Sequence, residues 1–252
     1  MNYPPINRIE DVVSALDSII AQSMKANDAS GYFASLYRRM TLAVSDGIKK
    51  GAFENGERME RLDIIFAKRY LDAYHQYKTG VSPSSAWKLA FDCAKANEST
   101  TIQHLLLGIN AHINLDLGIA AATLCPDKSI FNLKKDFDTI NVVISSLVQA
   151  VQSELEKIWF PMQLINKITG SVDDEVVNFS IGMAREAAWK VATDLAMMPV
   201  VQHPVYIKRL DESVTRLGIG IQKPPFVDGV VLKLVRLTEV REPRKVIALL
   251  NK

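Results

Sequence analysis

The stretch STTIQHLLLGINAHINLDLGIAAATLC, residues 99–125, decides the fold of this chain. Its apolar residues occur on every side of a helix rather than along one stripe, and Pro126 ends the run. A helix that is apolar all round must be covered by other helices. The stretch therefore predicts a buried central helix in an all-α protein.

The segments on both sides of this stretch have the helical spacing of apolar residues that such a cover requires. The expected helices before it are residues 9–20, 28–50, 57–79 and 83–97, and those after it are residues 134–158, 174–198, 204–217 and 230–250, the last broken at Pro243. Residues 218–225 read as a Gly/Pro connection, and residues 228–232 are the best candidate for a strand, although the helical spacing continues beyond them. We therefore expect one all-α domain over residues 1–252, with roughly eight to ten helices and a looser segment at 218–252.

Composition and charge argue against some classes of binding partner and of cellular location. The chain has 30 Lys and Arg against 28 Asp and Glu, a formal net charge of +2, without the basic surplus of a nucleic-acid-binding protein. The N-terminus lacks a secretory signal pattern, and no window is uniformly apolar over about 18 residues, so we expect a cytoplasmic protein without a membrane span. Cys93 and Cys125 have no metal-ligand spacing and read as buried free thiols.

The central stretch carries ionisable residues, which need hydrogen-bond partners, opposite charges or water when they lie in an apolar helix. His104, Gly108, His112 and Asp116 recur at steps of four, while Gln103, Asn110 and Asn114 form an amide arc on the opposite side. Residues four apart face each other on a helix, so His112 and Asp116 are candidates to share one divalent metal ion. Alternatively, Asp116 orients His112 as a general base, or the two form a structural buried pair.

Two further polar clusters are candidates to face this stripe. The first cluster places guanidinium groups beside phenols on two successive expected helices. It consists of Tyr37, Arg38 and Arg39 on one helix and of Lys68, Arg69 and Tyr70 on the next. Such a cluster suits binding of an anionic ligand, or it is a solvated basic edge. Asp63 lies on the second of these helices and is a candidate partner of Arg38 or Arg39.

The other cluster lies among apolar and small residues. Arg185 and Glu186 precede Trp189 in such a setting, where they either complete a polar network with Asp116 or form an internal ion pair.

Known catalytic and cofactor motifs are missing from the sequence. It contains no H-E-x-x-H, G-x-S-x-G or phosphate-binding glycine loop. Asp136 and Asp138 lack the D-D-x-x-D arrangement of isoprenoid enzymes, and Asp72-x-x-His75 alone does not make a ferritin-like di-iron site.

Three motifs together resemble a bacterial all-α family of unknown function: GYFASLYRRMT (31–41), RLDIIFAKRYLDAY (61–74) and HLLLGINAHINLDL (104–117). The likeness extends over about residues 31–195 and includes REAAW (185–189). It implies a fold and no activity.

A narrower likeness concerns Gly108, His112 and Asp116, whose spacing resembles a helix that supplies zinc ligands in the zinc-dependent phospholipase C and single-strand nuclease fold. The chain has only 4 histidines, too few for the three-zinc cluster of that fold, which leaves a one-metal site.

Two hypotheses of different classes follow. The first is a metal-dependent, hydrolase-like enzyme in which His112 and Asp116 act in a pocket while Arg38, Arg39 or Arg185 holds an anionic group. The second is a non-catalytic helical module that binds a small molecule or a protein partner, with His112 and Asp116 as a structural pair. Further candidate ligand contacts are Tyr37, Asp63, Tyr70, His104, Asn110 and Glu186. The sequence leaves the oligomeric state open.

Overall fold

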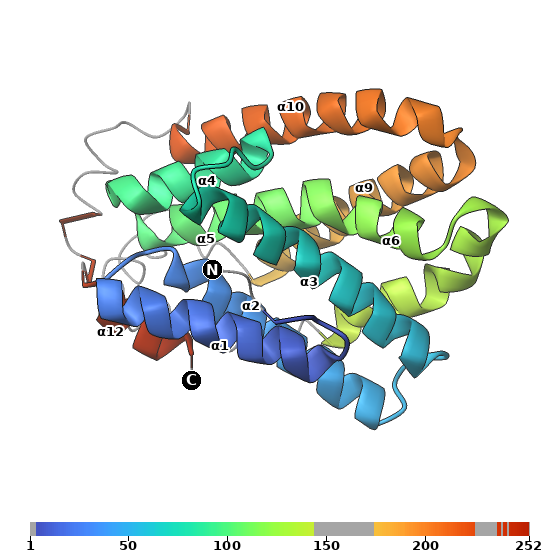
Figure 1. Ribbon diagram of the computed structural model, residues 1–252, viewed down its shortest axis with the longest axis horizontal. Coiled ribbons are helices and arrows are strands. Elements are labelled where there is room, and N and C mark those ends of the chain that lie inside the picture. Colours follow the sequence, from blue (N-terminus) through green and yellow to red (C-terminus); the bar gives the residue numbers. More distant parts are fainter. Residues whose placement is uncertain (1–3, 144–173, 225–235, 238, 241, 252) are drawn as a thin grey trace.

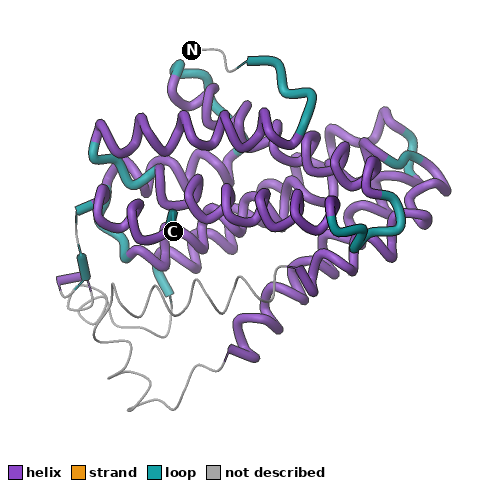
Figure 2. Tube along the Cα trace, turned by 90° about the horizontal axis from the view of Figure 1, so that it is seen from below, coloured by secondary structure: helices purple, strands orange, loops and turns teal. Residues whose placement is uncertain are grey.

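The helical fold is confirmed in the computed structural model, which describes residues 4–143, 174–224, 236–237, 239–240 and 242–251. Within these residues the regular structure is entirely helical (Figure 2). Before the central stretch lie α1 (Ile9–Ala26), α2 (Gly31–Lys49), α3 (Gly56–Lys78) and α4 (Ser85–Ala96). After it lie η2 (Asp127–Leu133), a helical segment over residues 134–143, α9 (Asp174–Met197), η3 (Val200–Gln202), α10 (His203–Gln222) and α12 (Pro243–Leu250). The strand candidate at 228–232 lies outside the described residues, as does most of the expected helix at 134–158.

The central helix is confirmed, and its middle is not a regular α-helix. It consists of α5 (Thr101–Ile109), the π-helical segment η1 (Asn110–Leu117) and α6 (Gly118–Leu124). In Figure 1 it runs below α4 and α10, and α2, α3 and α9 also pack against it. By length and composition this helix is apolar enough to cross a membrane, but 78% of its most apolar window is buried, as in the core helix of a soluble protein.

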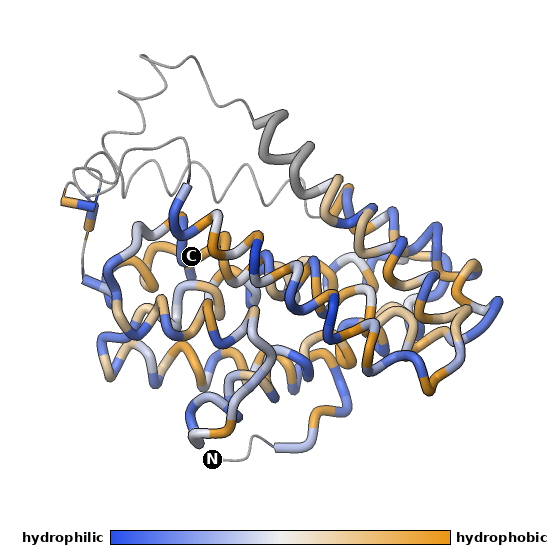
Figure 3. Tube along the Cα trace, turned by 90° about the horizontal axis from the view of Figure 1, so that it is seen from above, coloured by the Kyte–Doolittle hydropathy of each residue, from blue (hydrophilic) through white to orange (hydrophobic). Residues whose placement is uncertain are grey.

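The surrounding helices are amphipathic. Hydrophobic and hydrophilic residues alternate along them with the helical period (Figure 3). Their inner sides supply the largest fully buried side chains, among them Tyr32, Tyr70 and Trp87. Burial of these rings and of the aliphatic residues beside them is the main source of stability.

Glycines let helices approach the centre closely. A Cβ on Gly108 would lie 2.4 Å from Cδ2 of Phe33, so this glycine seats a phenyl ring of α2. A Cβ on Gly218 would lie 2.8 Å from Cδ2 of Leu89, and α10 continues past this glycine to Gln222. The expectation that a connection begins at Gly218 is therefore wrong, because here the glycine serves helix packing.

Candidate functional site

The π-helical segment η1 places the two central candidates in the core. Its wider turns shift residues from the regular α-helical wheel, and such segments are frequent at functional sites. His112 and Asp116, both on η1, are 3% and 1% exposed. Their side chains face α3 and α4, which lie against η1.

Asp116 is fully engaged by neighbouring helices. Nε of Arg69 on α3 donates to Oδ1 at 2.7 Å, and Nε1 of Trp87 on α4 donates to Oδ2 at 2.7 Å. Arg69 is partly exposed, while Trp87 is buried. The carboxylate therefore ties three helices together through a charge-assisted hydrogen bond and an indole hydrogen bond.

His112 is enclosed by aromatic rings. Its ring stacks on that of Phe66, with centroids 3.5 Å apart and planes 9° from parallel, and meets the edge of the Tyr37 ring at 4.4 Å. Nδ1 lies 3.6 Å from Oδ2 of Asp116, beyond hydrogen-bond distance, and neither ring nitrogen has a hydrogen-bond partner. Burial lowers the pKa of His112 more than Asp116 raises it, so the ring is neutral near pH 7.

Further buried polar atoms without a hydrogen-bond partner lie near this histidine or near its neighbour Tyr37. They are Tyr37 Oη, Thr41 Oγ1, Asp63 Oδ2 and Tyr70 Oη. Burial, with contributions from Asp63 and Asp116, raises the pKa of Tyr37 well above its usual value, although the nearby Thr41 side chain lowers it. We call Tyr37, Thr41, Asp63 and His112 the buried polar cluster. Native proteins leave few buried polar atoms unsatisfied, so a group of them at one place requires an explanation.

Asp63 makes the stability of the protein depend on pH. Burial raises the pKa of its carboxyl from 3.8 to about 7, so the folded state binds this proton more tightly than the unfolded state does. The contribution of Asp63 to stability is complete below pH 4 and decreases between pH 4 and 7. In that window it falls by about 1.4 kcal/mol per pH unit.

We therefore expect Asp63→Asn to remove most of the loss of stability that the wild-type protein shows between pH 5 and pH 7. Urea unfolding at both pH values measures this difference. The exposed Asp46, replaced by Asn, is the control and should retain the wild-type dependence. Equal pH dependence in Asp63→Asn and wild type would contradict a raised pKa at Asp63.

The basic candidates on α2 face away from Asp63. Arg38 forms an ion pair with Asp17 of α1, and Nη1 of Arg39 donates to the carbonyl of Leu250 on α12 at 3.4 Å. Among the described residues neither forms a salt bridge with Asp63, whose Oδ2 has no hydrogen-bond partner, so the expected ion pair is wrong. The guanidinium that reaches the site belongs to Arg69, because α3 rather than α2 presents it to Asp116.

Arg185 and Glu186 also differ from expectation. Arg185 is buried, donates from Nη2 to the carbonyl of Phe137 at 2.6 Å and lies over the Phe137 ring. Glu186 is exposed. The expected internal pair and the expected network with Asp116 are therefore wrong, because successive residues of α9 point to different sides.

The remaining candidates have separate surroundings. Nδ2 of Asn110 donates to the carbonyl of Val214 at 2.9 Å, which ties η1 to α10. His104 lies next to Cys93, with 3.6 Å between Nδ1 and Sγ. Tyr70 packs among the rings around His112. Sequence reasoning missed Thr41, Phe66 and Trp87 because an apolar or hydroxyl residue on a buried face has no distinguishing sequence signal.

A metal site at His112 and Asp116 is not supported. In the described part of the chain, no three or more His, Cys, Asp and Glu side chains gather to hold a metal ion. Both oxygens of Asp116 already accept hydrogen bonds, from Arg69 and Trp87. The donor set expected of a zinc or other transition-metal site is therefore incomplete.

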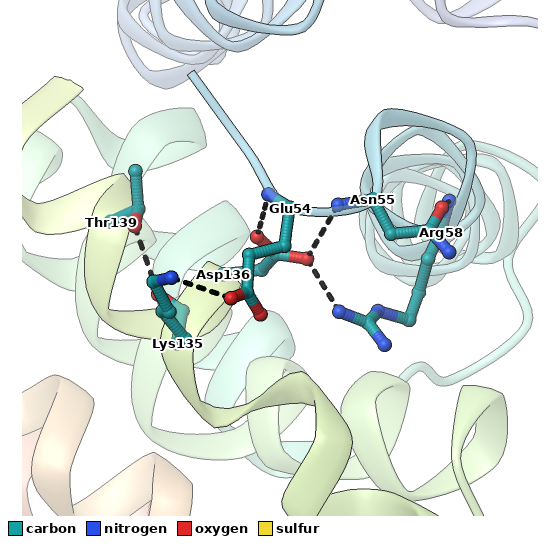
Figure 4. Close-up of polar contacts among 6 residues, drawn as sticks. All are labelled: Glu54, Asn55, Arg58, Lys135, Asp136 and Thr139. Atoms are coloured by element: carbon teal, nitrogen blue, oxygen red, sulfur yellow. Dashed lines mark hydrogen bonds and ion pairs between the residues drawn. The ribbon is translucent and has the colours of Figure 1, made fainter. Parts of the chain in front are cut away.

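A second buried carboxylate, Asp136, fixes the start of α3. It is fully buried and accepts hydrogen bonds from the backbone N–H groups of Glu54 at 2.6 Å and Asn55 at 3.2 Å and from Nη2 of Arg58 at 2.6 Å (Figure 4). A cavity of about 830 Å³ beside it is lined by charged side chains that pair with one another, such as Lys134 with Asp138 and Lys135 with Glu54. Asp136 thus holds the loop before α3 in place, rather than binding a metal ion for a diphosphate substrate.

Comparison with known proteins places the chain in a family. A family profile described as a family of unknown function (DUF5995) matches residues 9–224. Comparison with curated proteins and with solved structures gives no significant match. The matched residues include the central helix, Asp116 with its partners Arg69 and Trp87, and the buried polar cluster. The chain belongs to this family of unknown function, DUF5995.

Proposed function

We propose that this protein is a helical binding module that holds a small, uncharged, planar molecule beside His112. The observation that carries the proposal is the group of buried atoms without hydrogen-bond partners in the buried polar cluster. Leaving each such atom unsatisfied costs about 1–3 kcal/mol. A molecule that hydrogen-bonds to them would recover this free energy on binding.

Phe66 indicates the shape of the ligand and its route. Its ring stacks face to face on His112 and is partly exposed, so it lies between the imidazole and solvent. A planar ring that displaces Phe66 would retain the stacking contact on His112. The Tyr37 ring, whose centroid lies 6.1 Å from that of Phe66, would then flank the ligand as well.

The charges around the cluster favour a neutral molecule. Arg69 and Asp116 neutralise each other, His112 is neutral near pH 7, and the Asp63 carboxyl is uncharged below its pKa of about 7. The cluster offers hydroxyl groups as donors, and the imidazole nitrogens and a carboxyl oxygen as acceptors or donors according to their protonation. A ligand with one donor and one acceptor on a planar frame, such as an aromatic amide, fits these groups.

The arrangement favours binding over metal-dependent hydrolysis. The hydrogen bonds from Arg69 and Trp87 hold Asp116 as a fixed support behind the histidine. No second carboxylate or histidine approaches His112 closely enough to complete a metal site among the described residues.

The test uses Phe66→Ala, which removes the ring that covers His112. We expect benzamide to bind this variant at least tenfold more tightly than toluene, because only the amide can hydrogen-bond to the cluster. Saturation-transfer NMR and thermal shift measure both probes. Adding His112→Phe should weaken benzamide binding at least tenfold and leave toluene binding unchanged.

Phe53→Ala is the matched control, because Phe53 is buried beside Gly47 and away from His112. It opens a space of the same kind without these polar groups. The proposal fails if benzamide does not bind Phe66→Ala, if it binds Phe53→Ala equally well, or if His112→Phe leaves its affinity unchanged.

A further inference from the structure

The corner between α9 and α10 displays apolar side chains to solvent. Val200 and Val201 of η3 are 77% and 82% exposed. Met197, the last residue of α9, and Val205, in the first turn of α10, are each more than half exposed. We call these four residues the apolar corner. Contiguous exposed apolar side chains on a folded protein mark an interaction surface, whereas single ones are ordinary.

Polar side chains around the turn fix the shape of this corner. Oη of Tyr206 donates to Oδ2 of Asp194 at 2.9 Å, and Nε2 of His203 lies 3.3 Å from the carbonyl oxygen of Met198. Leu195, on the inner side of α9, is buried. The turn therefore holds the valines away from the core, and the described part of the chain leaves them uncovered.

The apolar corner lies at one end of the molecule. In Figure 1 the chain turns from α9 into α10 at the right-hand end, and α10 runs back from there along the longest axis. Side chains on such a corner diverge from one another. A deformable apolar phase, such as the boundary between lipid headgroups and acyl chains, surrounds diverging side chains more completely than a preformed protein surface does.

Basic residues lie directly behind the apolar corner. Lys208 and Arg209 follow Val205 by three and four residues on α10, so the three side chains share one face of that helix. Both cations are exposed, and neither forms an ion pair with the described residues. An α-helix rises about 1.5 Å per residue, which places the two charges about 4–6 Å behind Val205. The first acidic residue beyond them on this face is Glu212.

We propose that the apolar corner docks on the surface of membranes that contain anionic lipids. Val200 and Val201 enter the boundary between headgroups and acyl chains to a depth of about 5–10 Å, while Lys208 and Arg209 meet the lipid phosphates. No Lys, Arg, Asp or Glu lies between Met197 and Tyr206, so insertion buries none of these charges. The surface is separate from His112, and the proposal does not depend on the ligand proposed there.

Flotation of the full chain with unilamellar vesicles tests the proposal, with vesicles of phosphatidylcholine alone or mixed with phosphatidylserine. We expect at least tenfold tighter binding to the mixed vesicles, because their anionic surface attracts the two cations. Val200→Gln/Val201→Gln should weaken this binding at least tenfold without changing the charge. Leu217→Gln/Ile219→Gln is the matched control and should bind as the wild type does, because these exposed residues lie further along α10, Leu217 about 18 Å from Val205.

A second pair of variants tests the role of the charges. Lys208→Gln/Arg209→Gln should weaken binding to the mixed vesicles at least tenfold. Lys25→Gln/Lys245→Gln removes the same number of exposed positive charges near α12, which Figure 1 shows at the other end of the molecule. This control should change the affinity less than twofold. Circular dichroism verifies that each variant is folded.

Several outcomes would overturn the proposal. They are a wild-type protein that does not float with the mixed vesicles or binds both kinds equally, a folded Val200→Gln/Val201→Gln variant that binds as the wild type does, and equal losses in a variant pair and its control. Sedimentation without lipid provides a further test. A wild-type dimer that Val200→Gln/Val201→Gln converts to a monomer would show that a second copy of the chain, rather than a membrane, covers the corner.

Discussion

Replacing Asp116 by alanine is expected to lower the free energy of unfolding by about 3–5 kcal/mol. The change leaves the indole N–H of Trp87 buried without an acceptor and removes the carboxylate that pairs with Arg69. It also frees the π-helical segment from α3 and α4. Urea unfolding at pH 7, followed by circular dichroism, measures the loss.

The control for this prediction is Asp92→Ala. Asp92 pairs with Lys88 and accepts a hydrogen bond from Tyr77 at a solvent-exposed position, where such pairs contribute about 0–1 kcal/mol. Asp116→Asn, which retains one carbonyl acceptor, should fall between the two variants. A loss below about 1 kcal/mol in Asp116→Ala would contradict its role as the link between η1, α3 and α4.

The second large effect is expected at Asp136, where alanine should also cost about 3–5 kcal/mol. The substitution leaves the backbone N–H groups of Glu54 and Asn55 without their acceptor and breaks the ion pair with Arg58. The loop before α3 loses its buried attachment to residues 134–143, while the exposed Lys135–Glu54 pair remains. Urea unfolding measures the stability, and hydrogen exchange at the amides of Glu54 and Asn55 should show lost protection.

Asp138→Ala provides a close comparison. Asp138 lies two residues further on the same helix, is exposed, and pairs with Lys134. Its loss should change stability by less than about 1 kcal/mol and leave exchange at Glu54 and Asn55 unchanged. Similar effects of the two substitutions would show that Asp136 has no special role in holding this loop.

The helices are predictable where a local pattern specifies them. Ser84 and Thr100 cap α4 and α5 through their side chains, and Gly51 and Gly80 have positive φ angles just beyond the ends of α2 and α3. These signals depend on neighbours along the chain, so the sequence contains them. With Ser84 as its N-cap, α4 begins at Ser85, two residues after the expected start at residue 83.

The candidate site is predictable only in part. The sequence indicates that His112 and Asp116 need partners, because both lie in an apolar helix. It does not indicate which of several arginines supplies the guanidinium, since Arg38, Arg39 and Arg69 all lie within two residues of a tyrosine. The choice depends on how α2 and α3 rotate against η1, which is set by packing at Phe33, Phe66 and Tyr70.

The sequence alone determined an all-α protein around a buried central helix and the presence of a histidine and a carboxylate inside it, because periodicity and composition act locally. Only the tertiary structure decided that η1 is π-helical and that Arg69 and Trp87 donate hydrogen bonds to Asp116. It also decided that His112 and its neighbours retain buried polar atoms without hydrogen-bond partners. The hydrogen bonds from Trp87 and Arg69 to Asp116 join residues that are 29 and 47 positions apart in the chain. The rotation of each helix against its neighbours fixes such contacts, and this rotation follows from the packing of the whole core.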